Sequence, residues 1–422
     1  MKGGIIMKKV LTLCLMLMLA TTMIFAMAEQ EKMDTKEPVV LTIWEHTPQF
    51  ELPLKNTLAR FMEINPDIKV EYEIKTPDNY LSLLTTAIQA GEAPDLFWHH
   101  GTATSDMDNL TAQKALMDLT SYLELDNYSE MSMAKVRVDG KVYQTPAATI
   151  DTRATFYNKD LFAKMGWEIP TDFAEFETLL ATIKAAGYIP ISLAGRDSWN
   201  ILFLFEPILA ATNPDWIQEG ATGSARINDP RVIDAMNKMI EWGKKGYFGE
   251  NFLGVNEAGQ YLSFSKGQAA MTVAGSWTTD TLSKNNPDMN IGAFQMPTKD
   301  GRKPIVLTYA AGFSVYSKTQ EKAAAIKLAQ YLSSQESQQI WVDGLGAIAG
   351  LEGIKSGSSL ADEISDANLE LESFYNIMVL YHADGQAPTK IWEEDNPKLL
   401  SGSLTAEELV RMIDALMDYP NM

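Results

Sequence analysis

The side chains best suited to recognise a ligand gather in two short runs, Trp44-Glu45-His46 and Trp98-His99-His100. Indole and imidazole rings combine a flat apolar face with a polar N–H that needs a partner, so crowding them favours a wet crevice over a dry core. Such a crevice can stack on an apolar ligand face and hydrogen-bond to its edge. The alternative for residues 98–100 is a packed tryptophan beside two surface histidines.

Both runs close predicted β-strands. Residues 39–44 are nearly all apolar, as in a strand covered on both faces, and Pro94 suits the first residue of the strand that ends at Trp98. Asp95 is expected to accept backbone N–H groups and so to be structural. Periodicity predicts a helix around 54–62, a strand over 68–74, and a helix from Asp78 to Gly91. This alternation predicts a parallel α/β sheet, in which ligands bind at the carboxyl ends of strands.

The same patterns continue along the chain. Helices are predicted over 171–186, 230–242, 323–332 and 405–417, and strands over 270–274, 291–294 and 312–316. A short strand is expected within 140–146, and a strand that starts a helix within 155–162. At 422 residues the chain exceeds one hydrophobic core, which predicts two domains. No low-complexity linker separates the halves, so we expect two lobes joined by several crossings.

The N-terminus predicts export. Lys8 and Lys9 precede an apolar run, and Ala26-Met27-Ala28 supplies a small-x-small cleavage signal, so residues 1–28 are expected to be a secretory signal peptide. The charged residues 29–37 are expected to form a flexible leader. Cys14 lies inside the apolar run after Leu13, which argues against a lipid anchor. The sequence therefore predicts a soluble periplasmic protein.

Composition excludes several classes of function. Removing the three lysines of the signal takes the net charge from −20 to −23, which opposes binding to nucleic acid or anionic lipid. Cys14 is the sole cysteine, so the exported chain is expected to have no disulfide, thiol nucleophile or thiolate metal site. No later stretch approaches the roughly 18 consecutive apolar residues of a membrane span. A monomer is expected.

Five segments, taken in order, carry a more specific pattern. They are Phe61-Met62-Glu63-Ile64-Asn65-Pro66-Asp67-Ile68-Lys69-Val70, Gly91-Glu92-Ala93-Pro94-Asp95-Leu96-Phe97, residues 140–146 followed by Tyr157-Asn158-Lys159-Asp160-Leu161-Phe162, Gly267-Gln268-Ala269-Ala270-Met271 with Gly275-Ser276-Trp277, and Ser403-Leu404-Thr405-Ala406-Glu407-Glu408. In order and spacing they resemble the extracellular solute-binding proteins of ABC transporters, in particular the sugar-binding family that includes maltose-binding protein. Each match alone is weak, but five in the right order over this length are specific.

The resemblance implies a two-lobed periplasmic-binding-protein-like fold of the α/β class. Each lobe would be a mostly parallel sheet flanked by helices, with the ligand cleft between the lobes. Lobe 1 is expected to comprise residues 38–148 and 304–348, and lobe 2 residues 149–303 and 349–422. The family closes its lobes over a ligand, and the closed form is what a membrane ABC permease would recognise.

The resemblance also implies where a carbohydrate would bind. Trp44, Glu45, Trp98 and His99 end strands that face the cleft in the family, while Trp277, after Gly275, matches a position where the family stacks an aromatic ring. Further candidates are placed near the lobe crossings or in loop-like segments: Asp151, Arg153, Trp199, Tyr309 and Trp392. For each tryptophan the alternative is core packing, and for Asp151 with Arg153 it is a surface ion pair. Trp167, Trp216, Trp242 and Trp341 are expected to pack.

Other functions stay open as alternatives. His46, His99 and His100 with Glu45 allow a metal-site hypothesis, because imidazole and carboxylate are common zinc ligands. A secreted glycoside-active enzyme needs only two suitably spaced carboxyl groups, and the chain has 55 acidic residues. The sequence contains no Gly-x-Ser-x-Gly, His-Glu-x-x-His or phosphate-loop motif, so no cofactor is expected. A ligand-sensing module would share the same lobes.

Overall fold

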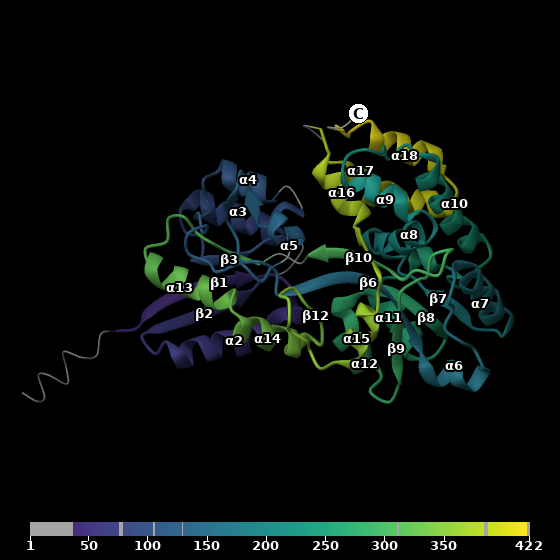
Figure 1. Cartoon of the computed structure of the whole chain (residues 1–422), viewed down its shortest axis with the longest axis horizontal. Helices are drawn as coiled ribbons and strands as arrows, with labels where there is room; N and C mark the ends of the chain where they lie inside the picture. Colours follow the sequence, from purple (N-terminus) through teal and green to yellow (C-terminus); the bar gives the residue numbers. More distant parts are fainter. Residues whose placement is uncertain are drawn as a thin grey trace, which may run out of the picture.

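The computed structural model describes residues 37–75, 79–103, 106–128, 130–309, 312–383 and 387–419. The expected signal peptide, nearly all of the expected leader, and Asp78 lie outside these residues. The chain forms two parts side by side, with the N-terminal strands in one and the C-terminal helices in the other (Figure 1).

The first part is built on a four-stranded sheet in the order β11-β3-β1-β2. Its strands are β1 (Val39–Glu45), β2 (Ile68–Ile74), β3 (Leu96–Trp98) and β11 (Phe313–Val315). β1 runs parallel to both β2 and β3, as the sequence predicts, and β11 closes the edge antiparallel to β3. A hairpin of β4 (Arg137–Val138) and β5 (Lys141–Val142) lies outside this sheet.

Helices cover both faces of this sheet, which explains why β1 and β3 are almost continuously apolar. Side chains of α2, α13 and α14 share one buried cluster with Leu41 and Ile43, whereas those of α3 and α4 pack with Phe97 on the other face. The helices are α2 (Glu51–Ile64), α3 (Tyr80–Ala90), α4 (Asp106–Ala112), α5 (Glu130–Ala134), α13 (Lys322–Leu332) and α14 (Gln335–Leu345), with short 3-10 turns η1 (Pro48–Phe50) and η3 (Gly101–Ala103).

Asp95 fixes β3 beside β1. Its carboxylate accepts the backbone N–H of Thr42 at 2.8 Å and the Thr42 hydroxyl at 3.0 Å, and it also accepts the Thr319 hydroxyl. The structural role predicted for Asp95 is therefore confirmed. The bonds set the strand register, so the two strands end at the same edge of the sheet.

The second part contains a seven-stranded sheet with the path β13-β10-β6-β8-β7, while β9 and β12 pair with β6 off this path. Its strands are β6 (Thr149–Asn158), β7 (Ile189–Ser192), β8 (Ala269–Gly275), β9 (Ile291–Phe294), β10 (Pro304–Tyr309), β12 (Ile348–Ala349) and β13 (Leu369–Glu372). The expectation of a mostly parallel sheet is wrong here. β6 runs antiparallel to β8, β9, β10 and β12, and among the described strands only β7–β8 and β10–β13 are parallel pairs.

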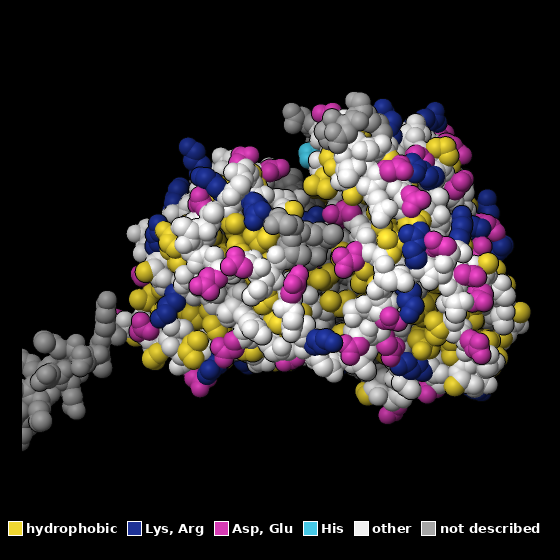
Figure 2. Space-filling view, viewed as in Figure 1, with side chains coloured by type: hydrophobic (Ala, Val, Ile, Leu, Met, Phe, Trp, Pro, Cys, Tyr) yellow, Lys and Arg dark blue, Asp and Glu magenta, His cyan; other side chains and the backbone are white. Residues whose placement is uncertain are grey.

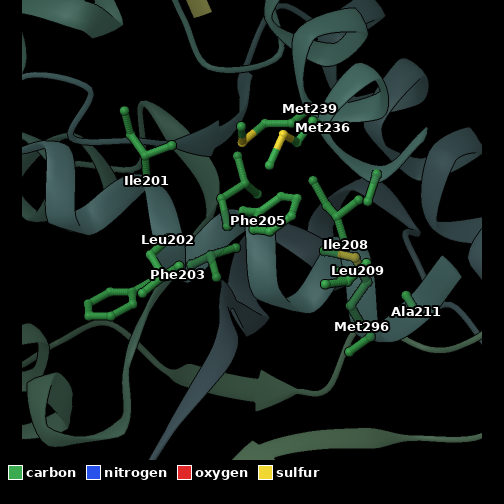
Figure 3. Close-up of a cluster of buried hydrophobic side chains, with 14 of the residues drawn as sticks. Ile201, Leu202, Phe203, Phe205, Ile208, Leu209, Ala211, Met236, Met239 and Met296 are labelled. Atoms are coloured by element: carbon green, nitrogen blue, oxygen red, sulfur yellow. The ribbon is translucent and has the colours of Figure 1, made fainter. Parts of the chain in front are cut away.

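The core of the second part is organised around α8 (Ser198–Thr212). This helix is apolar on nearly all sides, and a helix with that pattern is buried; Phe205 and Ile208 pack with Met236 and Met239 in Figure 3. The other helices are α6 (Lys159–Met165), α7 (Phe173–Ala185), α9 (Pro214–Ala221), α10 (Pro230–Lys244), α11 (Glu257–Ser265), α12 (Thr279–Asn285), α15 (Ser359–Ser365), α16 (Phe374–Leu380), α17 (Pro388–Ser401) and α18 (Ala406–Asp414), with η4 (Phe252–Gly254) and η5 (Ser276–Thr278). Trp216, Trp242 and Trp341 are buried, as predicted.

The chain passes between the two parts more than once. β6 follows the hairpin of the first part, β10 of the larger sheet is followed by β11 of the smaller one, and α14 is followed by β12, which pairs with β6. No helix among the described residues is both long and apolar enough to cross a membrane.

Candidate functional site

A cavity of about 480 Å³ lies between the two parts, and another of about 480 Å³ adjoins it. Both are lined by His46, His100, Trp199 and Glu393, so together they form one continuous cleft. The surface is hollowed between the two parts at the top of Figure 2. The space lies in the size range of small-molecule sites.

The first wall of the cleft stands at the carboxyl ends of β1 and β3. Trp44 of β1 lies beside Phe97 of β3, so the residues that follow the two strands meet at one edge. The imidazole of His46 packs against the indole of Trp98 with ring centres 4.2 Å apart, and His100 meets the same indole edge-on at 4.6 Å. Trp98 lines the cleft although it is only 4% exposed, because these rings cover most of it.

Trp44 and Glu45, predicted to face the cleft, do not line it. Trp44 packs with the α3 and α4 layer, and the Lys75 ammonium lies 4.2 Å from its ring centre. Glu45 is fully buried, where its carboxylate accepts the N–H of Thr47 and lies 3.5 Å from His46 Nδ1. Both residues are still inside β1, whose two faces are covered, and the lining begins beyond the strand with His46 and Thr47.

His99 is also buried behind the first wall. Its Nδ1 accepts the N–H of Gly101 at 3.1 Å, and its Nε2 lies 2.8 Å from Ser314 Oγ. Ser314 donates its own proton to the carbonyl of Tyr143, so the histidine donates from Nε2. Both ring nitrogens thus serve structure. No group of three or more His, Cys, Asp or Glu side chains in the described part of the chain could hold a metal ion.

The second wall begins on β6. Strand pairing places Asp151 opposite Thr308 of β10 and Arg153 opposite Gly275 of β8. Residues two apart in a strand share a face. Asp151, Arg153 and Thr308 accordingly all line the cleft.

An aromatic series extends this wall. Trp199 and Phe203 lie one turn apart on α8, with ring centres 5.3 Å apart in an edge-to-face contact. Phe203 meets Trp277 of η5 in the same manner, also at 5.3 Å. Trp199 is 40% exposed, which leaves it open to contact by a ligand. All three rings line the cleft.

Gly275 allows Trp277 its position. A Cβ at residue 275 would lie 2.3 Å from the Trp277 indole, well inside van der Waals contact. The missing side chain of Gly275 thus makes room for the indole.

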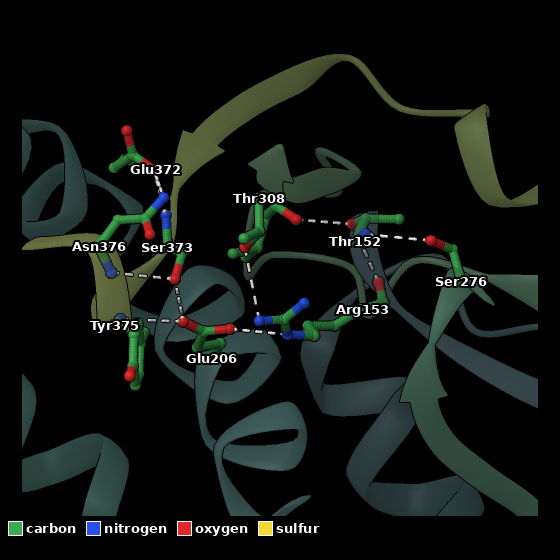
Figure 4. A network of polar contacts seen from close by, with 10 residues as sticks. Thr152, Arg153, Glu206, Ser276, Thr308, Glu372, Ser373, Tyr375 and Asn376 are labelled. Carbon is green, nitrogen blue, oxygen red and sulfur yellow. Dashed lines mark hydrogen bonds and ion pairs between the residues drawn. The ribbon is translucent and has the colours of Figure 1, made fainter. Parts of the chain in front are cut away.

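A buried ion pair underlies the second wall (Figure 4). Arg153 Nε donates to Glu206 Oε2 at 2.9 Å, and the two side chains are 4% and 1% exposed. Glu206 also accepts the Ser373 hydroxyl at 2.7 Å and the Tyr375 N–H at 3.2 Å. The Arg153 guanidinium lies 4.2 Å from the Phe203 ring centre. The guanidinium is therefore held by both charge and stacking.

This network reaches the first part through Glu372. Glu372 accepts from Asn376 Nδ2 at 2.7 Å and lies 3.5 Å from the ammonium of Lys135. Lys135 follows α5 beside the β4–β5 hairpin, and its side chain is 5% exposed. The ion pair therefore spans the two parts near the cleft.

Two carboxyl groups of the lining have raised pKa values. Burial raises the pKa of Asp151 to about 7, opposed by Arg153, His100 and a hydrogen bond from Thr149. Burial, with a smaller contribution from Glu394, also raises the pKa of Glu393. Both environments therefore favour the protonated, neutral form of the carboxyl group.

Trp392 and Tyr309 are the two remaining residues predicted to bind the ligand. Trp392 is among the residues that line the cleft, but its side chain is fully buried and packs against Phe205 and Phe374 with ring centres 4.9 and 5.5 Å apart. Tyr309 ends β10, and its side chain lies outside the described residues.

The sequence reasoning missed much of the lining. Eight of the residues that line the cleft were not predicted: Thr47, Phe50, Leu202, Phe203, Thr308, Tyr375, Asn376 and Glu393. Helical spacing from Trp199 could have found Phe203, but β10 and α16 were not predicted, so Thr308, Tyr375 and Asn376 gave no signal.

A two-part α/β fold with an aromatic, hydrogen-bonding cleft between its parts defines a ligand-capturing protein of the two-lobed class. The model of the bacterial extracellular solute-binding protein family matches residues 44–339, and the chain belongs to this family. It is 25% identical over 341 residues, or 78% of either chain, to the Multiple sugar-binding protein of Streptococcus mutans.

Solved structures confirm the predicted fold. The chain is similar to a chitin oligosaccharide binding protein, with a TM-score of 0.75 and 24% identity over 90% of this chain and 98% of that one. It is also similar to the solute-binding protein RafE in complex with raffinose, with a TM-score of 0.73 and 21% identity over 91% and 100%.

Proposed function

We propose that the protein captures a mono- or oligosaccharide between its two lobes and delivers it to a membrane ABC permease. The observation that carries the proposal is a cleft with aromatic rings on both walls and hydrogen-bonding groups between them. Sugar rings offer apolar C–H faces to indoles and hydroxyl groups to carboxylate and guanidinium. Relatives that bind sugars support this ligand class.

The proposed contacts divide between stacking and polar groups. Trp98, Trp199 and Trp277 supply ring faces or edges, while Asp151 and Arg153 supply hydrogen bonds. Trp44, Glu45 and His99 support these residues from behind, and the buried Trp392 contributes to the lining itself. Tyr309 stays a candidate because it follows Thr308 in β10.

The lobe division is part of the same proposal. The predicted lobes, 38–148 with 304–348 and 149–303 with 349–422, differ from the two sheets at β10 and at Ile348 of β12, which pairs with β6. Because β10 pairs with β6 and β13, we assign residues 304–309 to the second lobe and propose that the chain passes from β10 in the second lobe to β11 in the first. Ligand would favour the closed arrangement of the two lobes.

Export through the 1–28 signal and action as a periplasmic monomer complete the proposal. The family to which the chain belongs is extracellular. The net charge of −23 that remains after the three lysines of the signal are removed from −20 fits a soluble exported protein without nucleic-acid partners. Supply of a signalling receptor instead of a permease would use the same closed form.

A thermal-shift screen with mono- to tetrasaccharides tests the function. A sugar at 100 times its Kd should stabilise the protein by about 2.7 kcal/mol. Trp277→Ala should then weaken calorimetric affinity for that sugar by at least about tenfold, while Trp167→Ala, outside the cleft, should leave it unchanged. Unaltered affinity in Trp277→Ala would contradict the stacking role.

Asp151 gives a second function a specific basis. A cleft carboxyl group with a pKa of about 7 could serve as a general acid in glycoside cleavage. Incubating the wild type with each bound sugar and analysing the products by mass distinguishes the two. Unchanged sugar supports capture, whereas steady product release that Asp151→Asn abolishes would establish an enzyme.

A further inference from the structure

The cleft is lined by more acidic than basic side chains among the described residues. Among the described residues that line it, those with Asp, Glu, Lys or Arg side chains are Asp151, Arg153 and Glu393. Both carboxyl groups are half-buried, so water screens them less than it screens surface charges.

The single guanidinium does not balance these carboxylates. Arg153 already donates to Glu206 in a buried pair, and Glu206 is fixed from its other side by Ser373 and the N–H of Tyr375. A ligand carboxylate brought to Arg153 would therefore meet a compensated cation with Asp151 beside it. A second ligand carboxylate could not be placed favourably at the other end either, because Glu393 lines that end with Trp199 and His46.

An amino group on the ligand meets the opposite situation. Glu393 offers an anionic partner, and the exposed indole of Trp199 offers a face for a cation. Neutral hydroxyl groups can donate to either carboxylate without cost from like charge.

We propose that the cleft accepts neutral and basic saccharides and rejects acidic ones, with Asp151 and Glu393 setting this specificity. The inference rests on the proposed function, since it assigns a chemical class to the sugar. It differs from that function in predicting a charge rule that a shape-selective sugar site would not have.

The experiment compares saccharides that differ in one charged group. Wild type is screened by thermal shift at pH 8 and low salt with mono- to tetrasaccharides in neutral, amino and uronic acid forms. Calorimetry then measures each hit and its charged counterparts in wild type, Asp151→Asn, Glu393→Gln and the double variant. Glu394→Gln is the matched control, because it removes the same charge from α17 one residue away, at an exposed position outside the lining.

The uronic acid form should bind at least about tenfold more weakly than its neutral counterpart, since like charges in a partly desolvated site repel strongly. The double variant should narrow this gap at least about threefold, high salt should narrow it too, and Glu394→Gln should leave it unchanged. An acidic saccharide that binds wild type as well as its neutral form, or a gap unchanged in the double variant, overturns the inference and leaves the proposed function standing. If no saccharide of any class binds, both fall.

Discussion

The two walls of the cleft present similar aromatic surface but are held in different ways. On the first wall His46, Trp98 and His100 pack on one another where two parallel strands end. On the second wall Trp199, Phe203 and Trp277 are arranged around the Arg153–Glu206 ion pair. The first wall needs one sheet edge, whereas the second joins β6, α8, η5 and the segment before α16.

This difference suggests that the two walls contribute different kinds of contact to a bound ligand. On the first wall both ring nitrogens of the buried His99 are engaged within the protein, and the rings of His46, Trp98 and His100 offer mainly aromatic surface. The second wall carries Asp151 and Arg153 on one face of β6, so it can orient a ligand through hydrogen bonds. Substitutions that remove charge should therefore act on the second wall far more than on the first.

The largest effect is expected from Glu206→Ala. It leaves the Arg153 guanidinium buried without its carboxylate, and breaking a buried pair by removing one partner costs about 3–5 kcal/mol. Urea unfolding measures the loss. Arg153→Met combined with Glu206→Leu should recover much of the stability, because no uncompensated charge remains; a loss below about 1 kcal/mol in Glu206→Ala would show that the second wall does not depend on this pair.

Lys135→Met should weaken the contact between the two parts of the protein while both parts stay folded. The substitution removes the ion pair to Glu372 that joins the two parts, so the closed arrangement should be less populated. Sugar affinity is expected to fall about three- to tenfold, with small-angle scattering showing a larger radius of gyration in the bound state. Lys141→Met, at an exposed pair with Asp118 in the same part, is the control and should change neither.

Asp151 should make stability depend on pH through the second wall. Its pKa rises from 3.8 to about 7 in the folded protein, so folding favours the protonated form. Stability from this group is fully present below about pH 4 and is lost as pH rises through about 7. Urea midpoints from pH 5 to 8 should therefore fall less in Asp151→Asn than in wild type. Parallel curves would contradict the raised pKa.

The smallest effect is expected from Trp199→Ala. This ring is 40% exposed and touches Phe203 only edge-on, so unfolding free energy should change by less than about 0.5 kcal/mol. Sugar affinity should still drop about three- to tenfold if a ring stacks there. An affinity loss confined to Trp277→Ala would restrict ligand contact to the deeper half of the wall.

Local patterns predicted the first part well. Periodicity located β1, β2, β3 and α3, and Asp95 was correctly seen as structural, because neighbours in sequence decide these features. Among the candidate ligand-binding residues chosen from the sequence, Trp98, Asp151, Arg153, Trp199 and Trp277 line the cleft in the structure. It failed inside β1, where Trp44 and Glu45 were expected to face a ligand but are covered on both sides.

The second part was less predictable because long-range pairing decides it. β6 draws antiparallel partners from distant segments, and nothing in its own residues indicates that Thr308 will lie opposite Asp151. α8 is apolar all round and has no helical stripe, so its periodicity was hidden. Ion pairs such as Arg153–Glu206 join residues 53 apart and leave no local signature.

The contact between Gly275 and Trp277 has a consequence for the thermodynamics of binding. The indole packs directly on the backbone at Gly275 and edge-to-face on Phe203, and these two contacts order the ring before any ligand arrives. A side chain ordered in advance loses little rotational entropy on association. Gly275→Ala should thus make the entropy of sugar binding less favourable, even if Trp277 contacts the sugar in the variant as it does in wild type. Calorimetry would then detect a change in binding entropy although the structure of the complex is unchanged.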